Sequence, residues 1–410
     1  MLTTPPLPTS STLGRSLAPE DRQVRPFAAR KVVLVAVAIS LASSLACLLV
    51  VRAFLPPHES LWLDLMKWDA RWYRMIALHG YSWSPTSTAQ QTPNFFPPYP
   101  LFERAAHAVT GLPISHIAVF SSIVFQAVSA VLLTLIARDQ GASEREALLW
   151  LAMFLVSPPV VADIMGYYSA LFCVLCFLAI YLVPRGHTWL AAVAMGLASA
   201  ANPLGVAFAA GLVTWQLMGL VTSRTLSWAA LARLTGQALV SVSGLVGYIL
   251  YLLVAFRDPL AFYQATKGWS VPVAIPTVLG RILSFEPVRG SITSWAAAPY
   301  GPAVNFLLDA VVALAVVALI VALVALGGAA RNFGFWVLVF AFLLLQALSA
   351  RWGSEIGAMR ILLPVVFGVA AVGPVRRLLT RPPVFVVVTL CLMAMTGFLL
   401  QHLATGQWLD

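Results

Sequence analysis

The chain has 410 residues, of which 60% are hydrophobic and 10% are charged, and its formal net charge is +10. Its mean hydropathy is +0.88. Soluble domains carry about 25% charged residues, so this composition predicts an integral membrane protein with many spans. The basic residues are spread over connecting segments and form no continuous stripe, which argues against nucleic-acid binding. Abundant Ala and Val with only three lysines favour a GC-rich bacterial gene.

The apolar segments predict an all-α, polytopic membrane protein. Residues 1–31 are rich in Pro, Ser, Thr and Arg and are expected to form a mobile cytoplasmic tail. The run at about 32–55 is longer than a signal-peptide core, so we expect it to remain as the first transmembrane helix. Ten further segments give about eleven spans in a membrane domain over 32–402, before a tail at 403–410; they lie near 114–137, 147–162, 168–183, 188–201, 203–221, 236–256, 302–326, 333–349, 360–375 and 384–401. Breaks at Pro158-Pro159 and Asn202-Pro203 leave the number of spans open by about one or two.

Arg and Lys in short loops predict the orientation, because these residues resist translocation. These basic loops predict a protein of the plasma membrane whose N-terminus lies in the cytoplasm. Two long connections, 56–113 and 257–301, then lie outside together with the C-terminal tail. Long connections in a compact protein are usually functional, so we expect the active site on the extracytoplasmic face.

The first long connection begins with a predicted interfacial helix. Trp68, Trp72 and Ile76 recur every four residues and form one apolar face, and Gly80 is a natural stop. Three polar residues occupy an adjoining face: Asp69, Tyr73 and Arg74. The pattern alone favours a Trp-anchored helix with a solvated acid over a catalytic helix.

A second motif follows about 15 residues later, as Phe95-Phe96-Pro97-Pro98-Tyr99-Pro100. The prolines of this segment argue against a regular helix before about Leu101 and predict a stiff aromatic turn. Such a turn either caps the following helix or forms a wall around an apolar or isoprenoid chain. The pattern leaves both interpretations open.

Together the two motifs resemble the GT-C glycosyltransferases of the phosphatidylinositol-glycan class V (PIG-V) type, the GPI mannosyltransferases and their bacterial relatives. The family pattern is a Trp-Asp-x-x-x-Tyr helix that ends in Gly-Tyr, followed by a Phe-Phe-Pro-x-Tyr-Pro turn. Weaker similarities extend the resemblance over about residues 60–375, at Pro158, Tyr168-Ser169, Asn202-Pro203-Leu204-Gly205, Asp258-Pro259 and Met359-Arg360. Two positions depart from the family: Ala170 stands where an acidic residue is usual, and Asn202 where Arg is usual.

The resemblance implies a GT-C fold and an inverting transfer on the outer leaflet. A mannosyl or related residue would move from a polyprenyl-monophosphate sugar to a glycolipid, lipoglycan or glycoprotein acceptor. Asp69 matches the family aspartate and is the predicted general base, since a carboxylate must accept the proton of the attacking hydroxyl. The predicted substrate- and donor-binding residues are Trp68, Tyr73, Arg74, His79, Tyr99, Asp258, Gln264, Trp269 and Arg360. Arg360 would contact the donor phosphate. No cofactor is expected to be required, and a divalent metal is left open.

Several alternatives remain at the level of sequence. Asp64 is the competing base. Asp258 could orient the acceptor or a metal, but the sequence slightly favours a helix-end or turn residue before Pro259. Arg360 is equally explained as an interfacial anchor. Asp163 is expected to line a wet cleft, because ionisable groups at membrane depth are costly. Broken helices and Asp309 would suit a transporter or lipid flippase, whereas Ala170 and Asn202 would suit a non-catalytic scaffold of an envelope-glycan complex. A nucleotide-sugar donor on a Rossmann fold is disfavoured, because the sequence has no glycine-rich phosphate loop.

Overall fold

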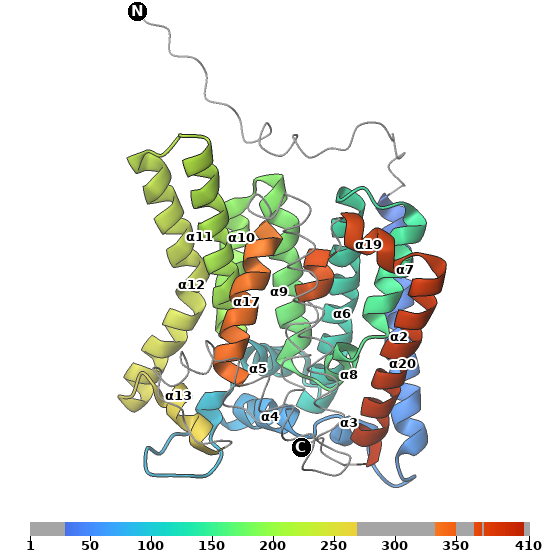
Figure 1. Ribbon diagram of the computed structural model, residues 1–410. Coiled ribbons are helices and arrows are strands. Elements are labelled where there is room, and N and C mark those ends of the chain that lie inside the picture. Colours follow the sequence, from blue (N-terminus) through green and yellow to red (C-terminus); the bar gives the residue numbers. More distant parts are fainter. Residues whose placement is uncertain (1–28, 269–332, 350–364, 371–372, 406–410) are drawn as a thin grey trace, which may run out of the picture.

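The protein is an all-α, polytopic membrane protein (Figure 1). The computed structural model describes residues 29–268, 333–349, 365–370 and 373–405. Within these ranges every regular element is helical. Six of the described helices are long and apolar enough to cross a membrane: Arg30–Phe54, Ile114–Asp139, Tyr168–Arg185, Gly205–Thr222, Trp228–Phe256 and Pro382–Gln401. The predicted span at 302–326 and part of that at 360–375 lie outside the described residues.

The first long connection folds into short helices at one end of the bundle. The chain enters it from α2 (Ala29–Phe54) and leaves it into α6 (Ile114–Asp139). Between them lie α3 (Leu61–Asp64), α4 (Asp69–His79), the 3-10 turn η2 (Thr92–Asn94) and α5 (Pro98–Thr110). These elements lie with α13 (Ala261–Ala265) at the bottom of Figure 1. We call this end of the bundle the motif end.

Helix α5 begins at Pro98, three residues earlier than the expected start near Leu101. The expectation was wrong because it treated every proline as a helix breaker. Residues of the first helical turn donate no intrahelical hydrogen bond, so Pro98 and Pro100 fit there without loss. Pro97 occupies the N-cap position, and the aromatic turn is therefore confined to the residues before it.

The predicted span at 147–162 is two helices. α7 (Glu144–Leu155) starts with a capping box between Ser143 and Glu146, and α8 (Pro159–Ile164) follows after a turn. The break falls at Ser157-Pro158-Pro159, where two consecutive residues lack the N–H that an α-helix needs. α9 (Tyr168–Leu182) then begins close to the motif end and continues into η3 (Val183–Arg185).

Small residues allow α10 (Thr188–Ala201) and α12 (Trp228–Phe256) to touch along their backbones. A side-chain carbon at Gly244 would collide with the carbonyl oxygen of Gly196, and one at Gly196 would lie 2.5 Å from the carbonyl oxygen of Val240. Close approach over glycines is a common mode of helix packing in membranes. α11 (Gly205–Thr222) lies between these two helices in sequence and starts after the expected break at Asn202-Pro203. α13 and η4 (Thr266–Gly268) follow α12.

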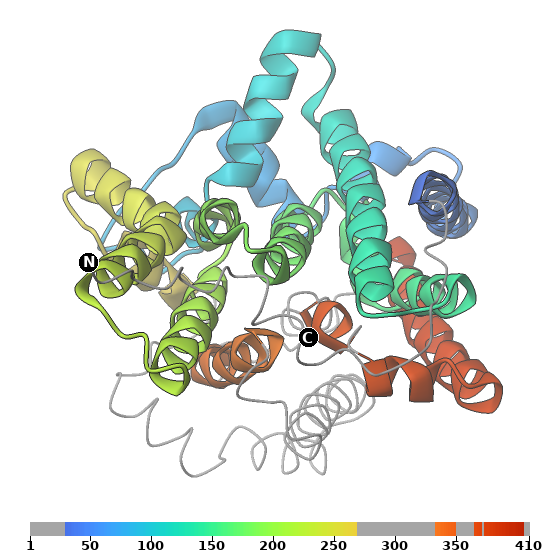
Figure 2. The same cartoon turned by 90° about the horizontal axis from the view of Figure 1, so that it is seen from above.

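The C-terminal elements complete the bundle. α17 (Phe333–Ser349) packs on α11, and α20 (Pro382–Thr405) packs on α2 after the short α19 (Gly373–Leu379). Viewed from above, the green helices α9 and α10 are seen nearly end-on near the centre of the bundle (Figure 2). The hydrophobic core is built mainly from α6, α7, α9 and α10.

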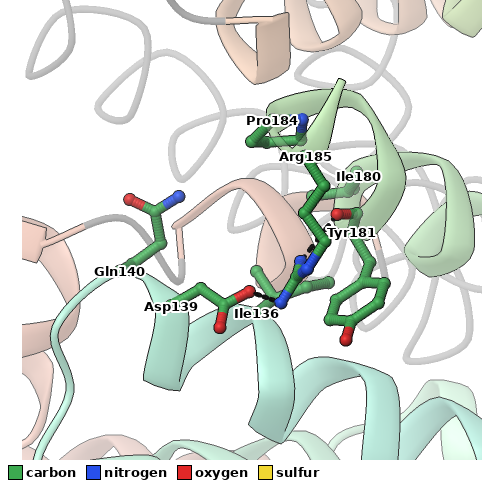
Figure 3. A pocket seen from close by; sticks show the side chains of 7 residues that line it. All are labelled: Ile136, Asp139, Gln140, Ile180, Tyr181, Pro184 and Arg185. Carbon is green, nitrogen blue, oxygen red and sulfur yellow. Dashed lines mark hydrogen bonds and ion pairs between the residues drawn. The ribbon is translucent and has the colours of Figure 1, made fainter. Parts of the chain in front are cut away.

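At the end of the bundle opposite the motif end, two arginines connect neighbouring helices. Arg185 forms an ion pair with Asp139, and its guanidinium carbon lies 3.3 Å from the centroid of the Tyr181 ring, beside a small pocket (Figure 3). Arg376 of α19 is buried and donates to the carbonyl oxygens of Ala137 and Gln140 at the end of α6. These contacts satisfy carbonyls that a helix C-terminus leaves without partners.

Candidate active site

Helix α4 starts with a sharp change of backbone direction. Its first residue is Asp69, whose side chain is half-buried, and its N-cap is Trp68. Trp68 has φ 53° and ψ −123°, a conformation that costs free energy for any residue other than glycine. The turn places the Asp69 carboxylate at the positive end of the helix dipole, where a negative charge is favoured.

The start of α4 is attached to the start of α9. The backbone N–H of Asp69 donates to the hydroxyl oxygen of Tyr167, at 3.3 Å. Tyr167 is the N-cap residue of α9 and is buried. This contact brings together segments that are 98 residues apart in sequence.

The two sequence motifs form one aromatic unit. The rings of Trp72 and Phe95 are stacked with centroids 5.5 Å apart, and Tyr73 meets Phe95 edge-on at 5.3 Å. Tyr73 also meets Tyr99 edge-on at 5.6 Å. Tyr99 is fully buried, and its hydroxyl group donates to the carbonyl oxygen of Ala118 in α6 at 3.0 Å. Edge-on and stacked pairs of this kind add stability beyond the burial of the rings.

A third segment, the start of α9, contacts the same unit and is itself contacted by the end of α10. The Tyr73 and Tyr168 rings have centroids 5.8 Å apart, and the Tyr168 hydroxyl oxygen accepts from the Asn202 side-chain amide at 2.6 Å. The Asn202 amide oxygen in turn accepts from the Leu204 N–H at 2.8 Å. The residues that carry the weaker family resemblance at these positions therefore lie beside the helix of the first motif.

Arg104 of α5 holds the other end of α4. Its guanidinium donates to the carbonyl oxygens of Ala77, at 2.7 Å, and Ile76, at 3.2 Å. α4 ends there because Gly80 adopts φ 83°, and a cation at a helix C-terminus is stabilised by the dipole. Sequence reasoning missed Arg104, since nothing in the pattern shows that α5 crosses the end of α4.

The competing base Asp64 is in a different environment. It is buried and forms an ion pair with Lys67 of the same turn, while its second oxygen has no hydrogen-bond partner among the described residues. Burial raises the pKa of Asp64 above its ordinary value, and Lys67 opposes this effect. Asp163 of α8 is also buried and accepts a hydrogen bond from the Ser169 hydroxyl at 3.2 Å.

Asp258 has the contacts of a turn residue. Its carboxylate accepts from the Leu260 N–H at 3.0 Å and from the Gln264 side-chain amide at 2.9 Å. The structure thus joins two predicted binding residues to each other at the corner between α12 and α13. Of the remaining predicted residues, Arg74 and His79 are exposed on α4, and Trp68 is half-buried. Trp269 and Arg360 lie outside the described residues.

The arrangement offers a carboxylate at the N-terminus of a helix whose Trp72 and Tyr73 belong to the aromatic unit. A carboxylate in such a position can accept a proton from a hydroxyl group. Among the described residues, no three His, Cys, Asp or Glu side chains come together as a metal site would require.

Comparison with known proteins gives one informative similarity. The chain is 26% identical over 260 residues to the mouse protein named GPI alpha-1,6-mannosyltransferase 2, an alignment that covers 58% of this chain and 50% of the mouse protein. The chain therefore spans about half the length of the curated relative that it matches. No family model matches the chain, and no solved structure matches it. The chain is thus similar to a protein named as a mannosyltransferase, which agrees with the resemblance carried by the two motifs.

Proposed function

We propose that this protein is an inverting GT-C glycosyltransferase that transfers a mannosyl residue from a polyprenyl-monophosphate sugar. The acceptor is an envelope glycolipid, lipoglycan or glycoprotein, and the reaction takes place at the motif end on the extracytoplasmic face of the plasma membrane. The observation that carries the proposal is the position of Asp69 as the first residue of α4, a helix that contacts α9 and α5 and contributes Trp72 and Tyr73 to the aromatic unit. The similarity to a mannosyltransferase supports the class of reaction.

In this proposal the acceptor hydroxyl oxygen attacks the anomeric carbon of the donor while Asp69 takes its proton. The bond between the anomeric carbon and the phosphate oxygen breaks, and the polyprenyl phosphate leaves with the electron pair. Attack opposite the leaving group inverts the anomeric centre. The negative charge that develops on the phosphate requires a cation, and Arg360 is the proposed partner, with Arg74 and His79 in reserve.

The rigidity of α4 supports this role. A general base is effective only when its carboxylate stays within hydrogen-bond reach of the acceptor hydroxyl. Tyr167 and Arg104 fix the two ends of α4, and the rings of Phe95 and Tyr99 pack on Tyr73 between them. The base therefore needs little reorganisation when substrates bind.

The test is the rate of mannosyl transfer by purified protein carrying Asp69→Asn. Loss of a general base lowers the rate by about 10²- to 10⁴-fold. Asp64→Asn tests the competing base in the same assay. Glu59→Gln, which removes an exposed carboxylate from the same connection, is the matched control and should retain the wild-type rate.

Two results would contradict the proposal in different ways. If Asp69→Asn turns over at the wild-type rate, Asp69 is not the general base, and Asp64 or Asp258 becomes the candidate. Failure of the wild-type protein to use any of a panel of lipid-linked sugars and envelope acceptors would contradict the transferase function, and would favour a transporter or a scaffold.

A further inference from the structure

The first turn of α4 has no side-chain cap from its own segment, although its second and third N–H groups donate to backbone carbonyls of the turn before it. An N-cap side chain normally accepts a hydrogen bond from one of the first backbone N–H groups of its helix. Trp68 holds this position and has no oxygen to accept with, so no side-chain cap is formed within the helix. The Asp69 N–H, the first of α4, instead donates to the Tyr167 hydroxyl oxygen. A residue of another helix thus supplies the acceptor that the local sequence lacks.

The surroundings of Tyr167 leave its hydroxyl group little freedom to move. The side chain is 1% exposed. The preceding Gly166 has φ +69°, and a side-chain carbon there would lie 2.7 Å from the side chain of Ala118 in α6. The hydrogen bond from Ser169 to Asp163 closes the turn between α8 and α9 on the other side. The junction between α8 and α9, residues 163–169, is therefore a rigid support.

We propose that Tyr167 is a positioning residue for the base: its hydroxyl oxygen caps α4 from α9 and fixes the Asp69 carboxylate toward the acceptor. This inference rests on the proposed function, because it concerns the same site. Tyr167 acts through the backbone of Asp69.

The proposal has a specific kinetic consequence. Without the hydroxyl group the first turn of α4 loses an acceptor at a point where the Trp68 backbone is already strained. The Asp69 carboxylate then moves relative to the acceptor hydroxyl, and a displacement of about 1 Å can cost about 10²-fold in rate. Substrate binding does not depend on this placement, so the loss falls on kcat and leaves KM unchanged.

The experiment combines Tyr167→Phe with Asp69→Asn in a double-mutant cycle. Tyr167→Phe keeps the ring and removes only the oxygen, and we expect kcat to fall by roughly tenfold or more with KM unchanged. In the Asp69→Asn background the same change should have no further effect on the residual rate, because there is no base left to position. An equal loss in both backgrounds would show a merely structural role and overturn the proposal, as would a wild-type kcat in the single variant.

Tyr248→Phe is the matched control. Tyr248 is also buried and its hydroxyl group donates to a backbone carbonyl, that of Pro93, at 2.8 Å. Its second and longer contact is with the carbonyl oxygen of Phe95, at 3.4 Å. We expect its kcat to remain within about twofold of wild type, since both carbonyl partners lie outside α4.

Hydrogen exchange provides a readout that is independent of activity. Tyr167→Phe should speed exchange of the backbone amides at the start of α4, whereas Tyr248→Phe should not. If wild-type protein transfers no sugar, the proposed function fails, and exchange still decides whether Tyr167 caps α4. Unchanged exchange in Tyr167→Phe would overturn the inference by itself.

Discussion

Four acidic residues at or near the motif end differ in what surrounds their carboxylates. Asp64 is paired with Lys67, Asp163 accepts from Ser169, and Asp69 stands half-buried at a helix N-terminus. Glu103 of α5 is fully buried, and neither of its oxygens has a hydrogen-bond partner among the described residues. An isolated buried carboxylate is costly, so such a group keeps its proton to higher pH.

Glu103 should therefore make stability depend on pH. Burial raises the pKa of Glu103 well above its ordinary value of 4.5. The folded protein then holds a proton that the unfolded chain has released, so stability is complete below about pH 4.5 and falls as pH rises toward the folded-state pKa. We expect Glu103→Gln to raise the free energy of unfolding by roughly 1–3 kcal/mol at neutral pH, and by nothing under acidic conditions.

Thermal unfolding in detergent across this pH range measures the effect. Glu59→Gln removes an exposed carboxylate from the same connection and should follow the wild-type profile. A Glu103→Gln protein that is less stable than wild type at neutral pH would show that the carboxylate has a partner that stabilises it.

For single residues, the sequence predicts part of the candidate active site. The motif pattern selects Asp69, and the Pro after Asp258 allows the turn alternative, which fits the contacts of Asp258. Tyr167 and Arg104 could not be found, because each acts on α4 from an element whose direction no local pattern specifies. Tyr99 was predicted to bind substrate or donor, and in the structure its hydroxyl group donates to a backbone carbonyl of α6.

At the scale of the elements, α10 and α12 approach each other closely over glycines. Gly244→Ala adds a carbon that must push the Gly196 carbonyl aside, so we expect it to lower the free energy of unfolding by about 1–3 kcal/mol. Gly247→Ala is the matched control, because nothing lies within 4 Å of the added carbon on the same helix. It should be neutral, or stabilising by about 0.5–1 kcal/mol, since Ala favours helix more than Gly does.

The melting temperatures of the two alanine variants, measured in the same detergent, decide this point. Equal melting temperatures would mean that the two helices separate readily and that their glycines are not required for packing.

Helix existence was easier to predict than helix continuity. The apolar run at 114–137 corresponds to α6, and that at 236–256 to most of α12, because unbroken hydrophobic stretches have few alternatives in a membrane. The run at 147–162 is equally apolar, yet it divides into α7 and α8. Hydropathy is insensitive to a missing backbone N–H. Within this run, only the pair Pro158-Pro159 indicated the break between α7 and α8.

For the whole molecule, the orientation in the membrane is the most direct test. If the motif end is extracytoplasmic, a cysteine at the exposed Thr88 should react with an impermeant maleimide in intact cells. A cysteine at the exposed Thr225, in the connection between α11 and α12, should react only after permeabilisation. The reverse labelling pattern would place Asp69 in the cytoplasm, away from an extracytoplasmic donor.

The lengths of the helices have a consequence for the surrounding lipid. α7 and α10 contain 12 and 14 residues, which at 1.5 Å per residue gives about 18–21 Å, whereas a bilayer core is about 30 Å thick. α6 and α12, with 26 and 29 residues, exceed that thickness. A bilayer meets such hydrophobic mismatch by thinning locally. We therefore expect headgroups to sink toward these short helices, of which α10 ends at Asn202, the residue that donates to Tyr168 beside the aromatic unit. Acyl-chain length then becomes a variable that sets how deep the phosphate of the proposed lipid-linked donor lies relative to the Asp69 carboxylate.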